Sequence, residues 1–417
     1  MFQKSIKRFN PASFLAPWLE MDWMLLVLVL GMTFLGGLMI RSTELNQGFT
    51  DWWQHWITGL VGLIIAMAIA RFRYENLLPW KWAIYSVLNL SLLAVRFVGS
   101  EGLGAQRWIN IAGFYVQPSE FAKIGIIVTL AALLHSATAN TIPNMIKVLI
   151  VTAVPWALVF IEPNLGTSLV FGAITMGMLY WGNANPGWIL LLLSPILSAI
   201  ILNLSVPVWA VWVIVIFALG WYCLPWSWLG GLVAMIINLI SGALGHMLWG
   251  VLKDYQKDRI LMFLDPDKDP LGGGYHLIQS RIAIGAGGTW GKGLFHGTQT
   301  QLNFIPEQHT DFIFSAIGEE LGLVGCLCVL LGFWLICLRL VIIAQNAKDN
   351  FGSLIAIGFL SMLVFQVVVN ISMNIGLAPI TGIPLPLLSY GRSSLLANFI
   401  GLGLVESVAN HRHQKFF

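Results

Sequence analysis

Charged residues are scarce in this sequence. Lys and Arg number 22 and Asp and Glu 19 among 417 residues, or 10% of the chain, whereas soluble domains carry about 25%. Hydrophobic residues make up 57%, and the mean hydropathy is +0.79. This composition excludes a soluble globule and predicts an all-α fold, that of a polytopic helical membrane protein. The net charge of +3 is too small to favour nucleic acid as a partner.

Cysteine is also rare, and the usual cysteine motifs are missing. The four cysteines lie in apolar runs, which predicts free thiols packed in helices and no disulfide framework. Cys326 and Cys328 have the wrong spacing for zinc ligands. The first residues lack a short apolar core followed by a small-residue cleavage site, so the first span is expected to serve as an uncleaved insertion signal.

A nucleotide-binding loop is missing too, although the run GAGGTWGKG at Gly285–Gly293 is rich in glycine. A P-loop needs glycine at position 286 and serine or threonine at position 293, and the chain has Ala286 and Gly293 there. We therefore expect no nucleotide or organic cofactor. The glycines are interpreted as positions of tight turns or close backbone approach.

Twelve apolar segments are candidates for membrane spans in windows of about 19 residues. They are 22–40, 52–70, 80–98, 119–136, 144–161, 165–182, 187–204, 207–223, 228–250, 312–340, 353–377 and 388–409. Prolines interrupt the three segments between 187 and 250, so this region has room for an extra pair of spans. We expect one integral membrane domain over 1–417, with about 10–12 transmembrane helices.

Basic residues predict the orientation. Those that flank the spans on one side are Lys4, Lys7, Arg8, Arg71, Arg73, Lys81, Arg339, Lys348, Arg412 and Lys415. The positive-inside rule identifies this side as the cytoplasm, which makes 251–311 a large extracytoplasmic loop. That loop carries Lys253, Lys257, Arg259, Lys268, Arg281 and Lys292. These cations either balance neighbouring acids or bind an anionic headgroup such as phosphate.

The stretch 265–320 holds seven of the 19 acidic residues, among long apolar spans. Asp311 stands where the loop becomes the tenth predicted span, close to Glu307 and His309. It is either the N-cap of that helix or a base whose pKa is raised by partial desolvation. Glu319 lies two helical turns further on and on roughly the same face as Asp311. With Glu320 it forms an acidic pair inside a span, which is either a functional site or a source of hydrogen bonds to other helices.

Three other polar segments adjoin spans. Glu120 and Lys123 share one helix face, and they either form a functional pair facing the bundle interior or belong to a well-capped helix start. Glu162 and Asn164 either form a connecting turn or line the same cavity. Arg392, in the polar run that begins the last span, either binds phosphate at a helix N-terminus or anchors the helix at the interface.

These segments together resemble the SEDS family, the shape, elongation, division and sporulation proteins, and its RodA branch more closely than its FtsW and SpoVE branches. The matching motifs are GAQRW (104–108), QPSEFAK (117–123), PNLGTS (163–168), DPLGGGYHLIQSRIAIGAGG (269–288), GKGLFHGTQTQLNFIPEQHTDFIFSAIGEELG (291–322) and PLPLLSYG (384–391). The resemblance runs from residue 104 to near the C-terminus.

The resemblance implies a peptidoglycan glycosyltransferase of the bacterial cytoplasmic (inner) membrane. Such an enzyme polymerises lipid II on the extracytoplasmic side for cell-wall elongation and shape, beside a class B penicillin-binding protein and with lipid tails between its helices. Asp311 corresponds to the essential acid of the family's HTDF motif. The expected substrate-binding residues are Arg107, Trp108, Glu120, Lys123, Arg259, Arg281, Lys292, His309, Glu319 and Ser389. Cations, or a divalent ion such as Mg²⁺ or Mn²⁺, would offset the charge of the leaving pyrophosphate.

The sequence departs from the family pattern at two candidate cavity residues and in its number of predicted spans. Asn164 stands where the family commonly has Asp, and Arg392 follows SYG where the family commonly has a second glycine. The family typically has ten spans. A lipid II flippase and a non-catalytic scaffold for a cell-wall synthase are the alternatives. A flippase needs polar groups at mid-membrane depth, whereas a scaffold would tolerate loss of Asp311.

Overall fold

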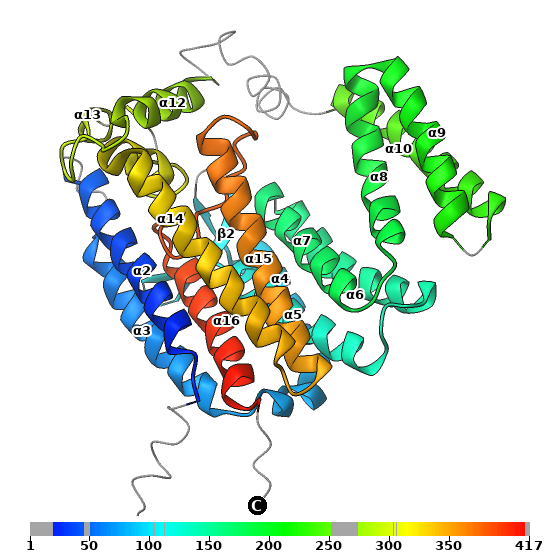
Figure 1. Ribbon diagram of the computed structural model, residues 1–417, viewed down its shortest axis with the longest axis horizontal. Coiled ribbons are helices and arrows are strands. Elements are labelled where there is room, and N and C mark those ends of the chain that lie inside the picture. The colour runs from blue at the N-terminus through cyan, green and yellow to red at the C-terminus, as the bar shows by residue number, and fades with distance from the viewer. Residues whose placement is uncertain are drawn as a thin grey trace, which may run out of the picture.

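The computed structural model describes residues 20–45, 51–102, 105–111, 113–162, 164–224, 226–251, 274–302, 304–305 and 307–412. Long helices that alternate in direction build it (Figure 1). They are α2 (Trp23–Thr43), α3 (Trp53–Arg71), α4 (Lys81–Val98), α5 (Pro118–Ser136), α6 (Ile142–Ile161), α7 (Leu165–Trp181), α8 (Pro186–Leu204), α9 (Val206–Cys223), α10 (Trp228–Val251), α14 (Ile313–Gln345), α15 (Asn350–Asn374) and α16 (Arg392–Asn410).

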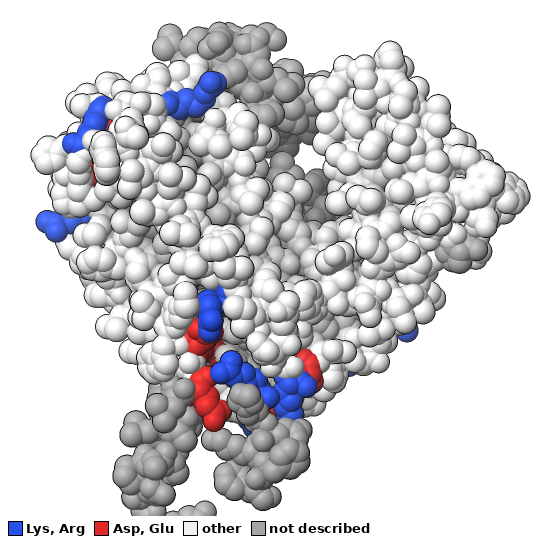
Figure 2. Space-filling model, viewed as in Figure 1, with Lys and Arg blue, Asp and Glu red and all other residues white. Residues whose placement is uncertain are grey.

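Ten helices in the described ranges are long and apolar enough to cross a membrane. The shorter α7 and the more polar α16 bring the long helices to twelve. Each of the twelve predicted segments is therefore a helix, and the chain is a multi-pass membrane protein. Figure 2 agrees, because the flank of the molecule is almost free of charged side chains.

We name the two ends of the bundle the upper end and the lower end, after their positions in Figure 1. At the upper end α2 finishes and α5, α7, α14 and α16 begin, whereas α16 finishes at the lower end, near the start of α2 (Figure 1). The core is formed by the body of the bundle, and among its largest buried side chains are Phe171, Phe351 and Phe399. Close packing of this kind lets one end hold a site in fixed geometry.

Helices α8, α9 and α10 form a separate three-helix unit, drawn in green at the right of Figure 1. Asn238 ties it together: its side-chain amide donates to Ser194 Oγ over 2.8 Å, and its carbonyl oxygens accept from Ser198 and Trp212. Such interhelical bonds suit an apolar medium, where unpaired polar groups are costly. The region 187–250 thus contains three full helices.

A small antiparallel sheet lies at the upper end, in a loop for which the sequence predicted no structure. Its strands are β1 (Ser100–Gly102), β2 (Ala105–Ile111) and β3 (Phe114–Val116), in the order β1-β2-β3. Gly113, with a φ of 86°, makes the turn between β2 and β3 and donates its N–H to Asn110 Oδ1 over 2.8 Å. A positive φ favours glycine. The sheet places Arg107 and Trp108 beside the start of α5.

Helix α14 is broken at Gly322, whose φ is 66° and ψ is −164°. The glycine-rich segment 288–293 enters the break. The N–H groups of Lys292 and Gly293 donate to the carbonyl oxygens of Glu319 and Glu320 over 3.0 Å each, and Leu323 N donates to Gly288 O over 2.9 Å. A Cβ on Gly291 would lie 2.1 Å from the carbonyl oxygen of Glu320. The glycines therefore permit close backbone approach, as predicted.

Candidate active site

A polar cavity of about 500 Å³ opens at the upper end. Its lining comes from the sheet, from the starts of α5, α7 and α16, from the segment before α14, and from the loop between α15 and α16. The lining residues are Arg107, Trp108, Tyr115, Gln117, Glu120, Asn164, Leu165, Thr167, Glu307, His309, Thr310, Asp311, Thr381, Gly382, Pro384, Tyr390, Gly391, Arg392, Ser393 and Ser394. Segments far apart in the sequence thus converge on one site.

Asp311 lies half-buried on the cavity wall, and its backbone is fixed by α15. The side-chain amides of Asn370 and Asn374 both donate to its carbonyl oxygen over 3.0 Å. The N-cap of α14 is Phe312, whose side chain makes no capping hydrogen bond. Asp311 is therefore not the N-cap residue, and it lines the cavity.

His309 and Ser389 hold the segment that carries Asp311. His309 Nδ1 lies 3.0 Å from Glu44 Oε1, and the His309 ring meets the Tyr390 ring edge-on at 5.8 Å. Ser389 Oγ donates to Thr310 O over 2.6 Å. His309 lines the cavity, whereas Ser389 is buried behind it and positions the neighbouring backbone.

Glu120 and Lys123 form a buried ion pair of 2.7 Å near the start of α5. Their side chains are 5% and 2% exposed, so both charges are removed from water. Glu120 lines the cavity, and Lys123 lies behind it. A buried pair of this kind is costly to break, because either partner alone would leave an uncompensated charge.

Arg107 connects the sheet with the turn between α6 and α7. Its Nε donates to the carbonyl oxygen of Glu162 over 3.4 Å. Burial raises the pKa of the Glu162 carboxyl to about 7, and the charge of Arg107 opposes this rise. Asn164 lines the cavity and also caps α7, since its Oδ1 accepts from Thr167 N over 3.3 Å. The prediction that both residues of this turn line the cavity is therefore correct for Asn164 and wrong for Glu162, which is absent from the lining.

Five of the predicted substrate-binding residues do not line the cavity: Lys123 and Ser389 lie behind it, and the other three are Lys292, Glu319 and Arg281. Lys292 Nζ lies 2.9 Å from Glu319 Oε1, and Glu319 also accepts from the N–H groups of Gln299 and Thr300. This pair fastens the short helix α13 (Thr298–Gln301) to α14. Arg281 is exposed on α12 (Tyr275–Gly287). Arg259 lies outside the described residues.

The structure places in the cavity Arg392, for which the sequence left two roles open, and adds two serines that the sequence did not single out. Arg392, Ser393 and Ser394 line the cavity from the first turn of α16. Ser393 Oγ donates to Tyr115 O and accepts from Gln117 N, over 3.1 Å in each bond. The polar run 389–394 was the available signal, but only the fold shows that it meets β3 and α5.

The fold and cavity define a class: multi-pass helical membrane proteins that hold polar chemistry in a cavity at one end of the bundle. A family model described as "Cell cycle protein", that of the FtsW, RodA and SpoVE proteins, matches residues 18–218 and 202–414. The chain belongs to this family, as the SEDS motifs indicate. The two matched ranges overlap at residues 202–218, which lie at the end of α8 and in α9.

Characterised relatives are similar over most of the chain. Peptidoglycan glycosyltransferase MrdB of Escherichia coli (strain K12) is 38% identical over 354 residues, which cover 84% of each chain. Peptidoglycan glycosyltransferase RodA of Treponema pallidum is 33% identical over 93% of this chain and 97% of its own. A solved structure described as "Structural coordination of polymerization and crosslinking by a peptidoglycan synthase complex" has a TM-score of 0.72 at 30% identity, covering 94% of this chain and 99% of the other.

Proposed function

We propose that this protein is a peptidoglycan glycosyltransferase that polymerises lipid II into glycan strands for cell-wall elongation and shape. The observation that carries the proposal is the placement of Asp311, half-buried in a polar cavity beside Glu120 and two arginines. Relatives at 33–38% identity bear the name of this activity. All 20 lining residues belong to the upper end, which favours a local reaction site over the continuous polar path that a flippase needs.

The reaction follows from the groups in the cavity. The Asp311 carboxylate takes the proton of an acceptor sugar hydroxyl while the hydroxyl oxygen bonds to the anomeric carbon of the donor. The bond from that carbon to the lipid pyrophosphate breaks, and the pyrophosphate leaves with the electron pair. A general base contributes about 10²–10⁴-fold to such a step. The Glu120–Lys123 pair holds one cavity wall rigid, and His309 and Ser389 hold the segment of the base.

The cavity end is assigned to the extracytoplasmic side. Arg71, Arg73 and Lys348 lie at the lower end, and the positive-inside rule puts such residues in the cytoplasm. The membrane is then the bacterial cytoplasmic membrane. We also propose a class B penicillin-binding protein as partner, supported by the similarity to the structure of a peptidoglycan synthase complex.

A requirement for Mg²⁺ or Mn²⁺ stays a prediction. In the described part of the chain, no group of three or more His, Cys, Asp or Glu is placed to hold a metal ion. An ion in the cavity would therefore share its ligands between Asp311 and the phosphates of the substrate, a common arrangement for Mg²⁺. Polymerisation rates in EDTA and after addition of Mg²⁺ or Mn²⁺ test this requirement.

The decisive experiment is lipid II polymerisation by the purified protein, with its partner, for wild type and Asp311→Asn. We expect glycan products from wild type and a loss of about 10²–10⁴-fold in the variant. Asp349→Asn is the matched control, since Asp349 is a carboxylate at the opposite end of the bundle that caps α15. Equal products from wild type and Asp311→Asn would remove Asp311 from the mechanism, and no products from either protein would favour a scaffold. Lipid II transport without products would favour a flippase.

A further inference from the structure

A network of fully buried polar side chains lies next to Asp311. Its members are Ser280 of α12, Ser315 of α14, and Asn370 and Asn374 of α15, and the exposed fraction of each is 0%. The cavity lining includes none of the four. Polar groups buried this deeply are stable where hydrogen bonds satisfy them. Because the network joins three helices at the candidate base, we examined what it fixes.

The hydrogen bonds of Asn374 determine its orientation. Its side-chain amide donates to Asp311 O over 3.0 Å and to Asn370 O over 2.8 Å, and its Oδ1 accepts from Ser315 Oγ over 2.6 Å. The reverse orientation would set Oδ1 against two carbonyl oxygens, which have no proton to donate. The Ser315 hydroxyl therefore donates to Asn374, and Asn374 donates to Asp311.

Ser280 completes the network from α12. Its Oγ lies 2.6 Å from Ser315 Oγ and 2.7 Å from the carbonyl oxygen of Asn374. Since the one proton of Ser315 goes to Asn374, Ser280 is the donor in both contacts and shares its proton between them. Asn374 is the last residue of α15, where a carbonyl has no partner inside the helix, and Ser280 supplies one. A chain of donors thus runs from α12 to the backbone of Asp311, and each bond polarises the next.

The backbone of Asp311 depends on this support. The N–H groups of 310–312 all donate to Glu307 O, over 3.1 to 3.3 Å, and Glu307 has a φ of 51°, in a region that favours glycine. A turn of this kind persists where its surroundings fix it. Asn370 and Asn374 both donate to Asp311 O, which fills the two lone pairs of that oxygen. The peptide plane after Asp311 is therefore held, and with it the direction of its side chain.

We propose that Ser280 and Asn374 are positioning residues for Asp311, so that α12, a helix outside the cavity, sets the direction of the candidate base. The inference rests on the proposed function for its effect on rate, whereas its effect on the backbone can be measured without turnover. Misplacing a reacting group by about 1 Å can cost about 10²-fold in rate. The loss of one hydroxyl from the network should cost a part of that factor.

Ser280→Ala removes the first donor of the chain and leaves the other members in place. We expect kcat for lipid II polymerisation to fall by about 10-fold, with KM unchanged because Ser280 does not line the cavity. Ser280→Thr keeps a hydroxyl and should restore most of kcat.

The matched control is Ser198→Ala, in the separate unit of α8, α9 and α10. Ser198 is also fully buried, and its Oγ donates to the carbonyl oxygen of Asn238 over 2.7 Å, the length of the bond from Ser280 to Asn374. Ser198→Ala should lower the melting temperature about as much as Ser280→Ala and leave kcat per folded molecule unchanged. A loss of kcat that is equal in the two variants would reduce Ser280 to a structural role and overturn the inference.

Amide hydrogen exchange of residues 307–315 gives a readout without turnover. We expect faster exchange of this segment in Ser280→Ala, and in Asn374→Asp, which keeps the acceptor for Ser315 and replaces the donor to Asp311 by an oxygen. If Asn374→Asp does not fold, Ser280→Ala decides alone. Exchange at the wild-type rate in a folded Ser280→Ala variant overturns the inference.

The outcomes separate this inference from the proposed function. If wild type polymerises lipid II and Ser280→Ala has the same kcat, or changes KM alone, the inference fails and the function stands. If wild type forms no glycan and exchange at 307–315 still rises in Ser280→Ala, the function fails and the hold of α12 on Asp311 stands.

Discussion

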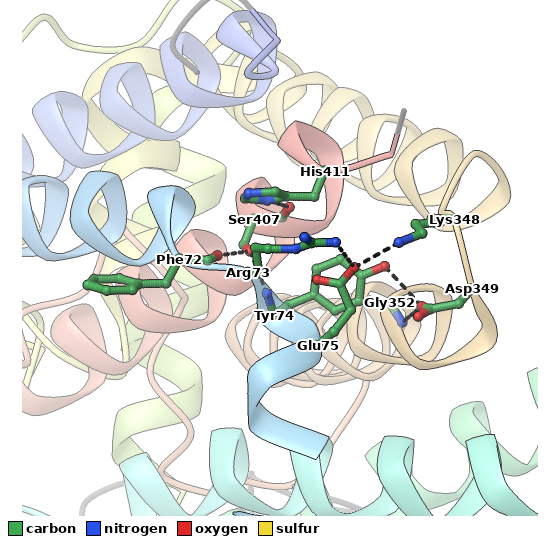
Figure 3. Close-up of polar contacts among 9 residues, drawn as sticks. All are labelled: Phe72, Arg73, Tyr74, Glu75, Lys348, Asp349, Gly352, Ser407 and His411. Atoms are coloured by element: carbon green, nitrogen blue, oxygen red, sulfur yellow. Dashed lines mark hydrogen bonds and ion pairs between the residues drawn. The ribbon is translucent and has the colours of Figure 1, made fainter. Parts of the chain in front are cut away.

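The two ends of the helix bundle differ in what their charged side chains surround. At the upper end, Asp311 and Arg392 line a cavity. At the lower end, acids and bases are bonded to one another (Figure 3). Figure 2 shows red and blue side chains gathered together at the lower end. The charges of the lower end join helices to one another, whereas charges of the upper end also line a cavity that a substrate could enter.

The lower network joins three elements that are distant in the sequence. Glu75 Oε1 lies 3.3 Å from Arg73 and 3.2 Å from Lys348 (Figure 3). Tyr74 donates its hydroxyl to Asp349 over 3.0 Å and its backbone N–H to Ser407 Oγ over 3.1 Å. The 3₁₀ helix Tyr74–Trp80 that precedes α4, the start of α15 and the end of α16 are held together there. The opposite ends of α15 and α16 carry the residues that face or fix Asp311.

After the loss expected for Asp311→Asn, the largest effect should come from the buried pair at the upper end. Lys123→Met leaves the Glu120 charge uncompensated, which should destabilise the protein by about 3–5 kcal/mol. Lys123→Met with Glu120→Gln removes both charges and should restore most of the stability. Thermal unfolding and lipid II polymerisation are measured on both. A double variant that regains stability and stays inactive assigns the pair a functional role, and recovery of both contradicts it.

Ser389→Ala tests whether a residue behind the cavity acts through position. It removes the bond to Thr310 O and the acceptor for Leu385 N. Leaving buried backbone groups unpaired costs about 1–3 kcal/mol. We expect lower stability and a reduced kcat with little change in KM, because Ser389 does not line the cavity. Ser389→Thr keeps the hydroxyl and is the control; a change confined to KM would contradict a positioning role.

The raised pKa of Glu162 predicts that the stability of the folded protein depends on pH. This pKa is about 7 in the folded protein and 4.5 in the reference state, so the folded state keeps a proton that the unfolded chain loses. Stability should therefore fall as pH rises from about 4.5 to about 7, and this contribution should be flat above that window. Glu162→Gln should remove it. Melting temperatures of the two proteins between pH 4.5 and 8 give the difference; parallel curves would contradict the prediction.

The smallest effect is expected at the lower end. Glu75 and its partners are partly exposed, with side-chain exposures of 23% for Glu75 and 25% for Lys348. Glu75→Gln should cost no more than about 1 kcal/mol, since solvent screens such pairs. Polymerisation per folded molecule should be unchanged. An activity loss without a stability loss would show that the lower network communicates with the cavity.

The spans could be predicted from sequence because a long apolar run in lipid must satisfy its backbone hydrogen bonds internally, and a helix does so. The predicted start of the last span was less accurate: the sequence indicated residue 388, whereas α16 begins at Arg392. Residues before it are bonded as a turn, with Ser389 N donating to Leu385 O, and Leu387 has a φ of 67°. Local hydrophobicity does not encode such a turn. The strands were also missed: β1 and β3 have only three residues each and give no period to detect, and the seven residues of β2 were interpreted as part of a loop.

The cavity was predicted in part. Motifs identified Asp311, Glu120, Arg107, Trp108 and His309, all of which line it. Glu319 was grouped with Asp311 by helical spacing, yet its carboxylate bonds the α13 turn instead. The sequence could not show that the segment 288–293 folds back against α14, because that contact depends on backbone groups and on the room left by glycines. Arg392 needed the fold as well, since its partners on the cavity wall come from distant segments.

The break in α14 makes the chain behave as two mechanical parts. Ile313–Leu321 is attached to the segment 288–293 through backbone bonds at the break, while the rest of α14 begins anew with its own first turn. The short helical piece that directly follows Asp311 is therefore bonded to a surface loop as well as to the bundle. A molecule that binds residues 288–293 would contact a segment joined by backbone hydrogen bonds to the same piece of helix as the candidate site.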